Sequence, residues 1–130
     1  MLFLVDTDWV IHFLNGRSDV VARIRELSAR GVAISRVSLA EVYEGIFYSR
    51  DPVADEAGLE EFLRGVTVLG IDDEITRIFG RERGRLRKLH KTIGDFDLLI
   101  GATALRHDLT LLSNNRRHFE RIENLRIISV

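Results

Sequence analysis

The stretch Leu2-Phe3-Leu4-Val5-Asp6-Thr7 is decisive for the fold, because an apolar run typical of a buried strand ends abruptly on an acid. Similar arrangements recur three times further along the chain. The strand-like Val32–Ser35 leads to Glu41, the segment Ile93–Asp97 leads into an apolar helix, and Thr110–Ser113 ends on a pair of asparagines. Ligands of open α/β sheets bind outside the carboxyl ends of the strands. The pattern therefore predicts that these polar side chains meet at one edge of a sheet.

Strand-like and helix-like stretches alternate along the sequence. We expect strands at Leu2–Val5, Val32–Ser35, Val66–Ile71, Leu109–Leu112 and Ile127–Val130. We expect helices at Trp9–Leu14, Val20–Arg30, Ser38–Ser49, Val53–Arg64, Asp72–His90 and Asp97–His107. Strands separated by helices need crossover connections, which make neighbouring strands parallel. The expected architecture is a single α/β domain spanning residues 1–130, a three-layer α/β/α sandwich with a mostly parallel sheet.

The composition is that of an ordinary globular protein, with 45% hydrophobic and 30% charged residues in 130. No apolar run approaches the roughly 20 residues that cross a bilayer, and no signal-peptide pattern is visible. The chain has no cysteine, which excludes disulfides and thiolate metal sites. We therefore expect a cytoplasmic protein with no membrane partner.

The net charge of −1 conceals an asymmetry between the two halves of the chain. Residues 1–65 carry 7 basic and 11 acidic side chains, whereas residues 66–130 carry 12 basic and 9 acidic ones. Seven basic residues lie between Arg77 and Lys91, against the single acid Glu82. Such a run attracts nucleic-acid phosphates, although a solvated helix face is the simpler explanation. Helical spacings of four and three place Arg81, Arg85 and Lys88 on one face, so we predict that they contact nucleic-acid phosphates.

Each polar residue at a strand end also has a simpler explanation as a helix cap. Ser38-Leu39-Ala40-Glu41 fits a capping box, and Asp95, Asp97 or Asn115 can cap the helix that follows it. Capping does not, however, require an acid after almost every strand. Carboxylates within about 4 Å of each other repel by roughly 4 kcal/mol per pair, so a cluster needs a cation or a shared proton.

An all-oxygen cluster favours Mg²⁺ or Mn²⁺, because hard cations prefer oxygen ligands. A divalent ion held by carboxylates activates water and stabilises the charge that develops on a phosphoryl oxygen. Phosphodiester hydrolysis is the reaction that this chemistry favours. The four histidines show no metal-binding spacing, and Trp9, Phe13, Phe47 and Tyr48 have spacings suited to core packing.

Two alternatives remain open on the residues alone. Asp6-Thr7-Asp8-Trp9-Val10 also fits the signature of haloacid-dehalogenase-like phosphatases, in which Asp6 would be a nucleophile. That fold needs a lysine well before its last acidic motif, and Lys91 lies only four residues before Asp95. The second alternative is a non-catalytic interaction module that keeps the fold without the metal.

Four segments, in order and spanning the chain, resemble the motifs of the PIN-domain ribonucleases, in particular the VapC-like toxins of toxin–antitoxin pairs. The segments are Leu4–Asp8, Ile34–Gly45, Ile93–Ala104 and Leu111–Phe119. The resemblance places the family's acids on Asp6, Glu41 and Asp97. Asn115 stands where many members have an acid, and Gly101 stands where Ala is usual.

The resemblance implies a Mg²⁺- or Mn²⁺-dependent endoribonuclease that acts as the toxin of a type II pair. Asp6, Glu41 and Asp97 would hold the ion, and Asn115 would complete the catalytic set. Ser113, Thr7 and the additional acid Asp95 are possible accessory residues. RNA as the substrate, a VapB-like antitoxin as the partner and a homodimer are likewise implied.

Overall fold

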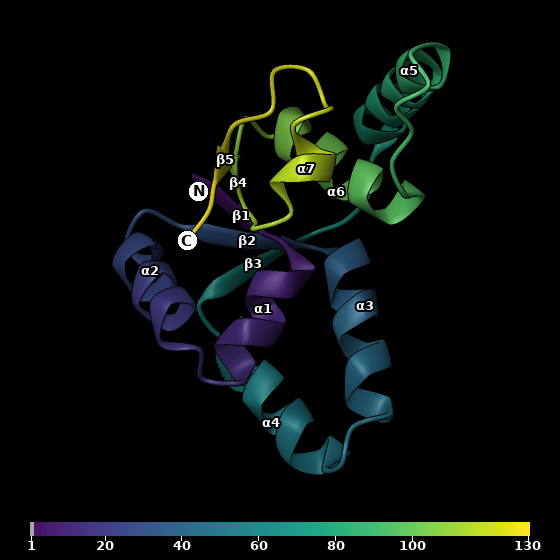
Figure 1. Ribbon diagram of the computed structural model, residues 1–130. Coiled ribbons are helices and arrows are strands. Elements are labelled where there is room, and N and C mark those ends of the chain that lie inside the picture. The colour runs from purple at the N-terminus through teal and green to yellow at the C-terminus, as the bar shows by residue number, and fades with distance from the viewer. Residues whose placement is uncertain (1) are drawn as a thin grey trace.

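The computed structural model, which describes residues 2–130, contains a five-stranded sheet (Figure 1). Its strands lie in the order β3-β2-β1-β4-β5, and every neighbouring pair is parallel. The strands are β1 (Phe3–Val5), β2 (Val32–Ser35), β3 (Val66–Leu69), β4 (Thr110–Leu112) and β5 (Ile127–Ile128). The predicted strands are thus confirmed, with β3 and β5 two residues shorter than expected.

All six expected helices are present, with ends shifted by at most two residues. They are α1 (Thr7–Leu14), α2 (Ser18–Ser28), α3 (Arg36–Phe47), α4 (Pro52–Leu63), α5 (Asp73–Lys88) and α6 (Asp95–Arg106). A short seventh helix, α7 (Arg116–Phe119), lies between β4 and β5. None of the helices in residues 2–130 combines the length and the apolar character that a bilayer crossing requires.

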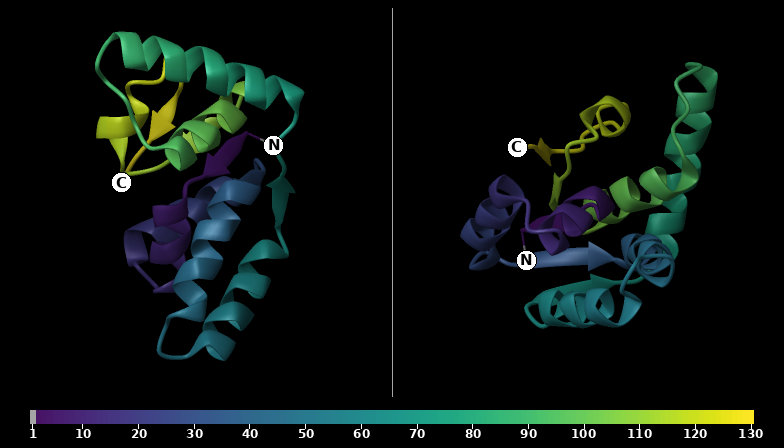
Figure 2. Two further views of the ribbon diagram at one scale, coloured as in Figure 1. Left: turned by 90° about the vertical axis from the view of Figure 1, so that its right-hand side faces the viewer. Right: turned by 60° about the horizontal axis from the view of Figure 1, so that its bottom comes forward.

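Helices cover both faces of the sheet, as the three-layer prediction requires (Figures 1 and 2). The alternation of side chains along β1 builds two cores. Phe3 and Val5 pack with residues of α1, α2, α3 and α4 on one face, whereas Leu4 packs with residues of α5, α6 and α7 on the other. Because both faces are buried, the strands read as continuous apolar runs.

Two expectations about side chains near α3 are wrong. The helix begins at Arg36 rather than Ser38, because the Ser35 hydroxyl at the end of β2 already caps it, accepting from the Ser38 amide at 3.0 Å. Phe47 and Tyr48, expected in the core, are 63% and 89% exposed. They lie at the end of α3, beyond the area that the sheet covers, whereas Trp9 is fully buried as predicted.

The topology brings three strand ends together. β1 pairs with β2 on one side and with β4 on the other, so Val5 lies opposite both Ile34 and Leu112. The next residue along each chain segment, Asp6, Ser35 or Ser113, therefore lies at a neighbouring point of the same edge of the sheet. This is the edge where the sequence predicted a site.

Candidate active site

Asp6 is a buried acid at the junction of β1 and α1. It occupies the N-cap position of α1, and its Oδ1 accepts a hydrogen bond from the Thr7 amide at 2.8 Å. Its other oxygen, Oδ2, accepts from the Ser113 hydroxyl at 2.7 Å. Burial and then the nearby Asp8 carboxylate raise the pKa of Asp6 to about 8, which the Ser113 hydrogen bond partly counteracts. A cation close to Asp6 would offset the cost of its charge.

Glu41 comes to the same edge from α3 and is joined to α1. The Thr7 hydroxyl donates to Glu41 Oε1 at 2.7 Å. Because α3 begins at Arg36, Glu41 is its sixth residue and the expected capping box does not form. Burial, followed by repulsion from Asp97 and Glu44, raises the pKa of the Glu41 carboxyl.

Asp97 forms the third wall of the site together with Asn115 and His118. The Asn115 amide nitrogen, Nδ2, donates to Asp97 Oδ2 at 3.3 Å, and His118 Nδ1 lies 3.4 Å from the same oxygen. The N-cap of α6 is Gly94, so neither Asp95 nor Asp97 has the capping role considered for it. Asn115 occupies the N-cap position of α7, but its side chain makes no capping hydrogen bond there.

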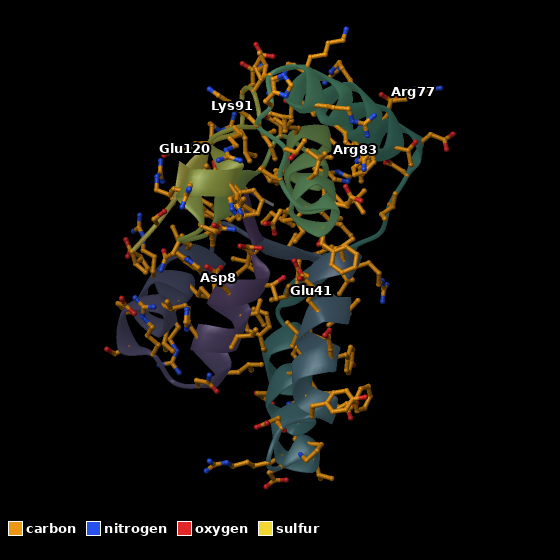
Figure 3. The ribbon with its side chains drawn as sticks, turned by 45° about the vertical axis from the view of Figure 1, so that its right-hand side comes forward. Asp8, Glu41, Arg77, Arg83, Lys91 and Glu120 are labelled. Carbon is orange, nitrogen blue, oxygen red and sulfur yellow. The ribbon has the colours of Figure 1, made fainter. Side chains whose placement is uncertain are left out.

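The three acids and Asn115 line one groove of about 500 Å³. It is lined by Asp6, Thr7, Asp8, Ile11, Glu41, Asp97, Asn114 and Asn115. The structure thus gathers all four residues predicted as catalytic, together with Thr7. Asp8, on α1, and Glu41, on α3, both lie near the centre of the molecule, where these helices meet the sheet (Figure 3).

Three residues of this site were not singled out from the sequence. Asp8 Oδ1 is buried without a hydrogen-bond partner, a placement that its position in the first turn of the helix capped by Asp6 could have indicated. Asn114 was visible in the sequence only as one of the asparagine pair after β4, and His118 gave no signal. Their neighbours in space belong to α1, α6 and the end of the chain.

Asp95, predicted as a possible accessory residue, lies outside the groove. Its carboxylate forms an ion pair with Arg83 of α5 at 3.0 Å and lines a separate cavity between α5 and α6. The backbone of α6 turns by about 100° per residue, so side chains two positions apart, such as Asp95 and Asp97, point to different sides of the helix.

The basic helix α5 divides into structural and exposed residues. Arg85 donates to both oxygens of the buried Glu82, at 2.7 and 3.0 Å, and to the Arg121 carbonyl at 2.7 Å. Glu82 also accepts from the Glu123 amide, so this pair fastens α5 to the segment after α7. Arg81 and Lys88 are exposed, and Arg77 and Arg83 lie along the same helix in Figure 3.

The chemistry of the groove fits a hard divalent cation. Its charged groups are carboxylates, Asp6 and Glu41 have raised pKa values, and a buried oxygen of Asp8 lacks a partner. Oxygen donors of this kind suit Mg²⁺ or Mn²⁺. Within residues 2–130, no three Asp, Glu or His side chains are arranged as a ready-made metal centre.

Comparisons with known proteins agree with the geometry. The PIN domain model matches residues 3–125. The chain is 34% identical over 125 residues to Ribonuclease VapC2 of Haemophilus influenzae (strain ATCC 51907 / DSM 11121 / KW20 / Rd), with 95% of this chain and 94% of that protein covered. It is 30% identical over 124 residues to the tRNA(fMet)-specific endonuclease VapC of Shigella flexneri, with 95% and 94% covered.

Solved structures show the same fold. VapBC2 from Rickettsia felis bound to a DNA fragment from its promoter aligns with a TM-score of 0.92 and 27% identity over 99% of this chain and 98% of that one. DNA-bound VapBC from Salmonella typhimurium aligns with a TM-score of 0.90 and 29% identity, with the same coverage. The match to one family over nearly the whole chain sets the dehalogenase-like alternative aside. The chain belongs to the PIN-domain family, within the group formed by the VapC ribonucleases.

Proposed function

We propose that this protein is a Mg²⁺- or Mn²⁺-dependent endoribonuclease and the toxin of a type II toxin–antitoxin pair. The observation that carries the proposal is the acidic groove at the carboxyl ends of β1, β2 and β4, with Asp6 buried in its wall. A protein that used this edge only for packing would gain nothing from keeping four carboxyl groups there, because they repel one another.

Asp6, Glu41 and Asp97 would hold the ion, with Asp8 and Asn115 beside them. The bound ion would supply an activated water and stabilise the charge that develops on the phosphoryl oxygen. The protein's own part is orientation: Ser113 fixes one oxygen of Asp6, Thr7 fixes one of Glu41, and Asn115 fixes one of Asp97. Glu41 and Asp97 therefore each have one oxygen hydrogen-bonded to a neighbour, and Asp6 has both, because its Oδ1 also accepts from the Thr7 amide.

The test is cleavage of RNA by Asp97→Asn beside a matched control, Asp95→Asn. Both acids lie in the first turn of α6, but only Asp97 lines the groove. We expect Asp97→Asn to abolish metal-dependent cleavage and Asp95→Asn to retain it. Equal cleavage by wild type and Asp97→Asn would contradict the nuclease assignment and support the non-catalytic module. In calorimetric titrations, Asp97→Asn should likewise lose Mn²⁺ binding and Asp95→Asn should retain it.

For the RNA-binding surface we propose the exposed basic residues of α5, Arg81 and Lys88, with Arg85 holding the helix in place. The proposal rests on their exposure and on the ion pairs that Arg85 forms with Glu82 and Glu123. Arg81→Gln with Lys88→Gln should flatten the dependence of log K on log salt by about 0.7 for each lost contact with single-stranded RNA. Arg77→Gln, one turn before Arg81 and paired with Glu74 in the first half of α5, is the control. An unchanged slope would leave this face as solvated surface.

We further propose a VapB-like antitoxin as partner and a homodimeric toxin, acting in the cytoplasm, where RNA is available. The acids adjoin a second groove of about 760 Å³ that shares Thr7, Ile11 and Glu41 with the first and includes Tyr48 and Phe96. An arginine flanked by apolar residues would match this combination, since a guanidinium binds carboxylates bidentately. Inhibition of RNA cleavage by such a segment should weaken as the Mn²⁺ concentration rises at a fixed antitoxin concentration. Inhibition insensitive to Mn²⁺ would place the antitoxin outside the metal site.

A further inference from the structure

Three consecutive residues after β4 each reach a different part of the site. The Ser113 hydroxyl donates to Asp6, and the Asn115 side chain donates to Asp97. Between them, Asn114 Oδ1 accepts two hydrogen bonds, from Trp9 Nε1 at 3.1 Å and from the Val130 amide at 3.0 Å. Asn114 thereby joins α1 and the segment after β5 at a single oxygen atom.

The backbone of Ser113, just before Asn114, is already hydrogen-bonded to the segment 128–129. The Ser113 amide donates to the Ile128 carbonyl at 3.0 Å, and the Ser129 hydroxyl donates to the Ser113 carbonyl at 2.6 Å. Beyond Ser113 the chain leaves the sheet. Asn114 is tied to α1 and to Val130 through its side chain. The Asn115 carbonyl accepts from the His118 and Phe119 amides of α7, so its backbone is held on the α7 side only. The one backbone bond of Asn115 to the site, from its amide to Ser113 Oγ at 3.0 Å, stays within the loop 113–115.

Trp9 is a rigid anchor for this loop. Its side chain is fully buried, and its Nε1–H can only donate, so the Asn114 carbonyl is a matched acceptor. Trp9 lies three residues after Asp6 on the helix that Asp6 caps. The bond from Trp9 to Asn114 is therefore a second tie, beside the Ser113–Asp6 bond, between the Asp6 side of the groove and the loop that carries Asn115.

We propose that Asn114 is a positioning residue of the metal site, which acts through Trp9 and the 128–130 segment to place Asn115 against Asp97. The inference rests on the proposed metal-dependent function. It differs from the roles given to Asp6, Glu41 and Asp97, because Asn114 need not touch the ion or the RNA. Residues that orient metal ligands typically change metal affinity or activity by about 10- to 100-fold when they are replaced.

The lone tryptophan allows the proposal to be tested without activity. Asn114→Ala removes the acceptor, so the Trp9 emission maximum should shift, and the dissociation constant for Mn²⁺, measured by calorimetry, should rise about 10- to 100-fold. Asn114→Asp keeps an oxygen acceptor for both donors. It should restore the wild-type emission and bind Mn²⁺ at least as tightly as wild type. Asn15→Ala, at the exposed end of α1, is the control and should match wild type in both measurements.

Each other outcome has a definite meaning. A shifted emission with unchanged Mn²⁺ affinity in Asn114→Ala would overturn the proposal, because the bond would then be structural only. Restored emission without restored affinity in Asn114→Asp would also overturn it, since Asn114 would act through its own amide group. If Asn114→Ala does not fold, Trp9→Phe removes the donor while keeping an aromatic ring in the core and should weaken Mn²⁺ binding in the same way. Unchanged binding there counts against the proposal. Failure of wild type to cleave RNA would reject the proposed function while leaving these two measurements interpretable.

Discussion

The Ser113 hydroxyl donates a hydrogen bond to Asp6 Oδ2 over 2.7 Å, although 107 positions separate the two residues in the sequence. Both side chains are buried, at 0% and 4% exposure, so little water competes for this bond. It stabilises the ionised form of Asp6 in a place where burial and Asp8 both oppose ionisation. The strand pairing of β1 with β4 is what brings the two residues together.

Ser113→Ala should move the lower pH limit of the nuclease activity upward. The hydroxyl lowers the pKa of Asp6, so its loss raises that pKa and a higher pH is needed to ionise the carboxyl. A hydrogen bond to a charged group contributes about 1.5 kcal/mol, which corresponds to a shift of about one pH unit. Ser113→Thr, which keeps a hydroxyl, is the control. A pH–rate profile of Ser113→Ala identical to that of wild type would show that this bond does not govern Asp6.

Glu41→Gln should separate charge from structure at the second acid. Gln retains an oxygen that can accept from the Thr7 hydroxyl, so thermal stability should stay within about 1 kcal/mol of wild type. Metal-dependent cleavage should be lost, because a neutral amide is a weaker ligand for a hard cation. Thermal unfolding checks the expected stability, and RNA cleavage by the same preparation checks the expected loss of activity. A variant that cleaves normally would remove Glu41 from the metal site.

The metal-free protein should lose stability as the pH rises from about 4 to 8. The pKa of Asp6 is about 8 in the folded chain against an ordinary value of 3.8, so the folded state binds the proton more tightly. This contribution is fully present below the ordinary pKa and is lost as the pH rises through the folded one. Glu41, whose pKa is also raised, adds to the same trend.

The measurement is the melting temperature in chelator across this pH range, for wild type and Asp6→Asn. The variant lacks the titrating group. Its melting temperature should therefore exceed that of wild type by a margin that increases toward pH 8. This difference cancels the opposite trends of acids with lowered pKa, such as Glu82. Added Mg²⁺ should raise the wild-type curve most at the upper end of the range. Parallel curves would contradict the raised pKa of Asp6.

Gly101→Ala should destabilise the fold even though Ala favours helices. A Cβ built on Gly101 lies 2.3 Å from Ile122 Cδ1, and the position is buried in α6 against the segment after α7. Overpacking of this kind costs about 1–3 kcal/mol, which equals or exceeds the roughly 1 kcal/mol gained in helix propensity. Ile122→Val removes that methyl group, so the double variant should recover part of the loss in denaturant unfolding. Equal losses in the single and double variants would contradict this packing explanation.

The order of strands and helices, and the gathering of acids at one edge, followed from local pattern alone. Apolar runs that end on acids predict buried parallel strands, and parallel strands direct their carboxyl ends to a common edge. Asp6, Glu41, Asp97 and Asn115 could therefore be named from the sequence with the PIN-like motifs as support, and the structure brings all four to one groove.

Only the tertiary structure decided which neighbours these acids have. Ser35 displaced Ser38 as the cap of α3 because the end of β2 places its hydroxyl over the first turn, and this freed Glu41 to bind Thr7. Asp95 and Asp97 look equivalent in the sequence, but packing of α6 against α5 pairs Asp95 with Arg83.

The same holds for Arg85 and Asn114, whose partners no local pattern predicts. Arg85 belongs to a basic run, yet the burial of Glu82 makes it part of the structure. Asn114 joins Trp9, 105 positions earlier, to Val130, 16 positions later. Periodicity and capping depend on residues within a few positions of one another, so the sequence determined the elements and the edge of the site. Hydrogen bonds between distant residues depend on how the elements pack, so only the folded chain decided the partners.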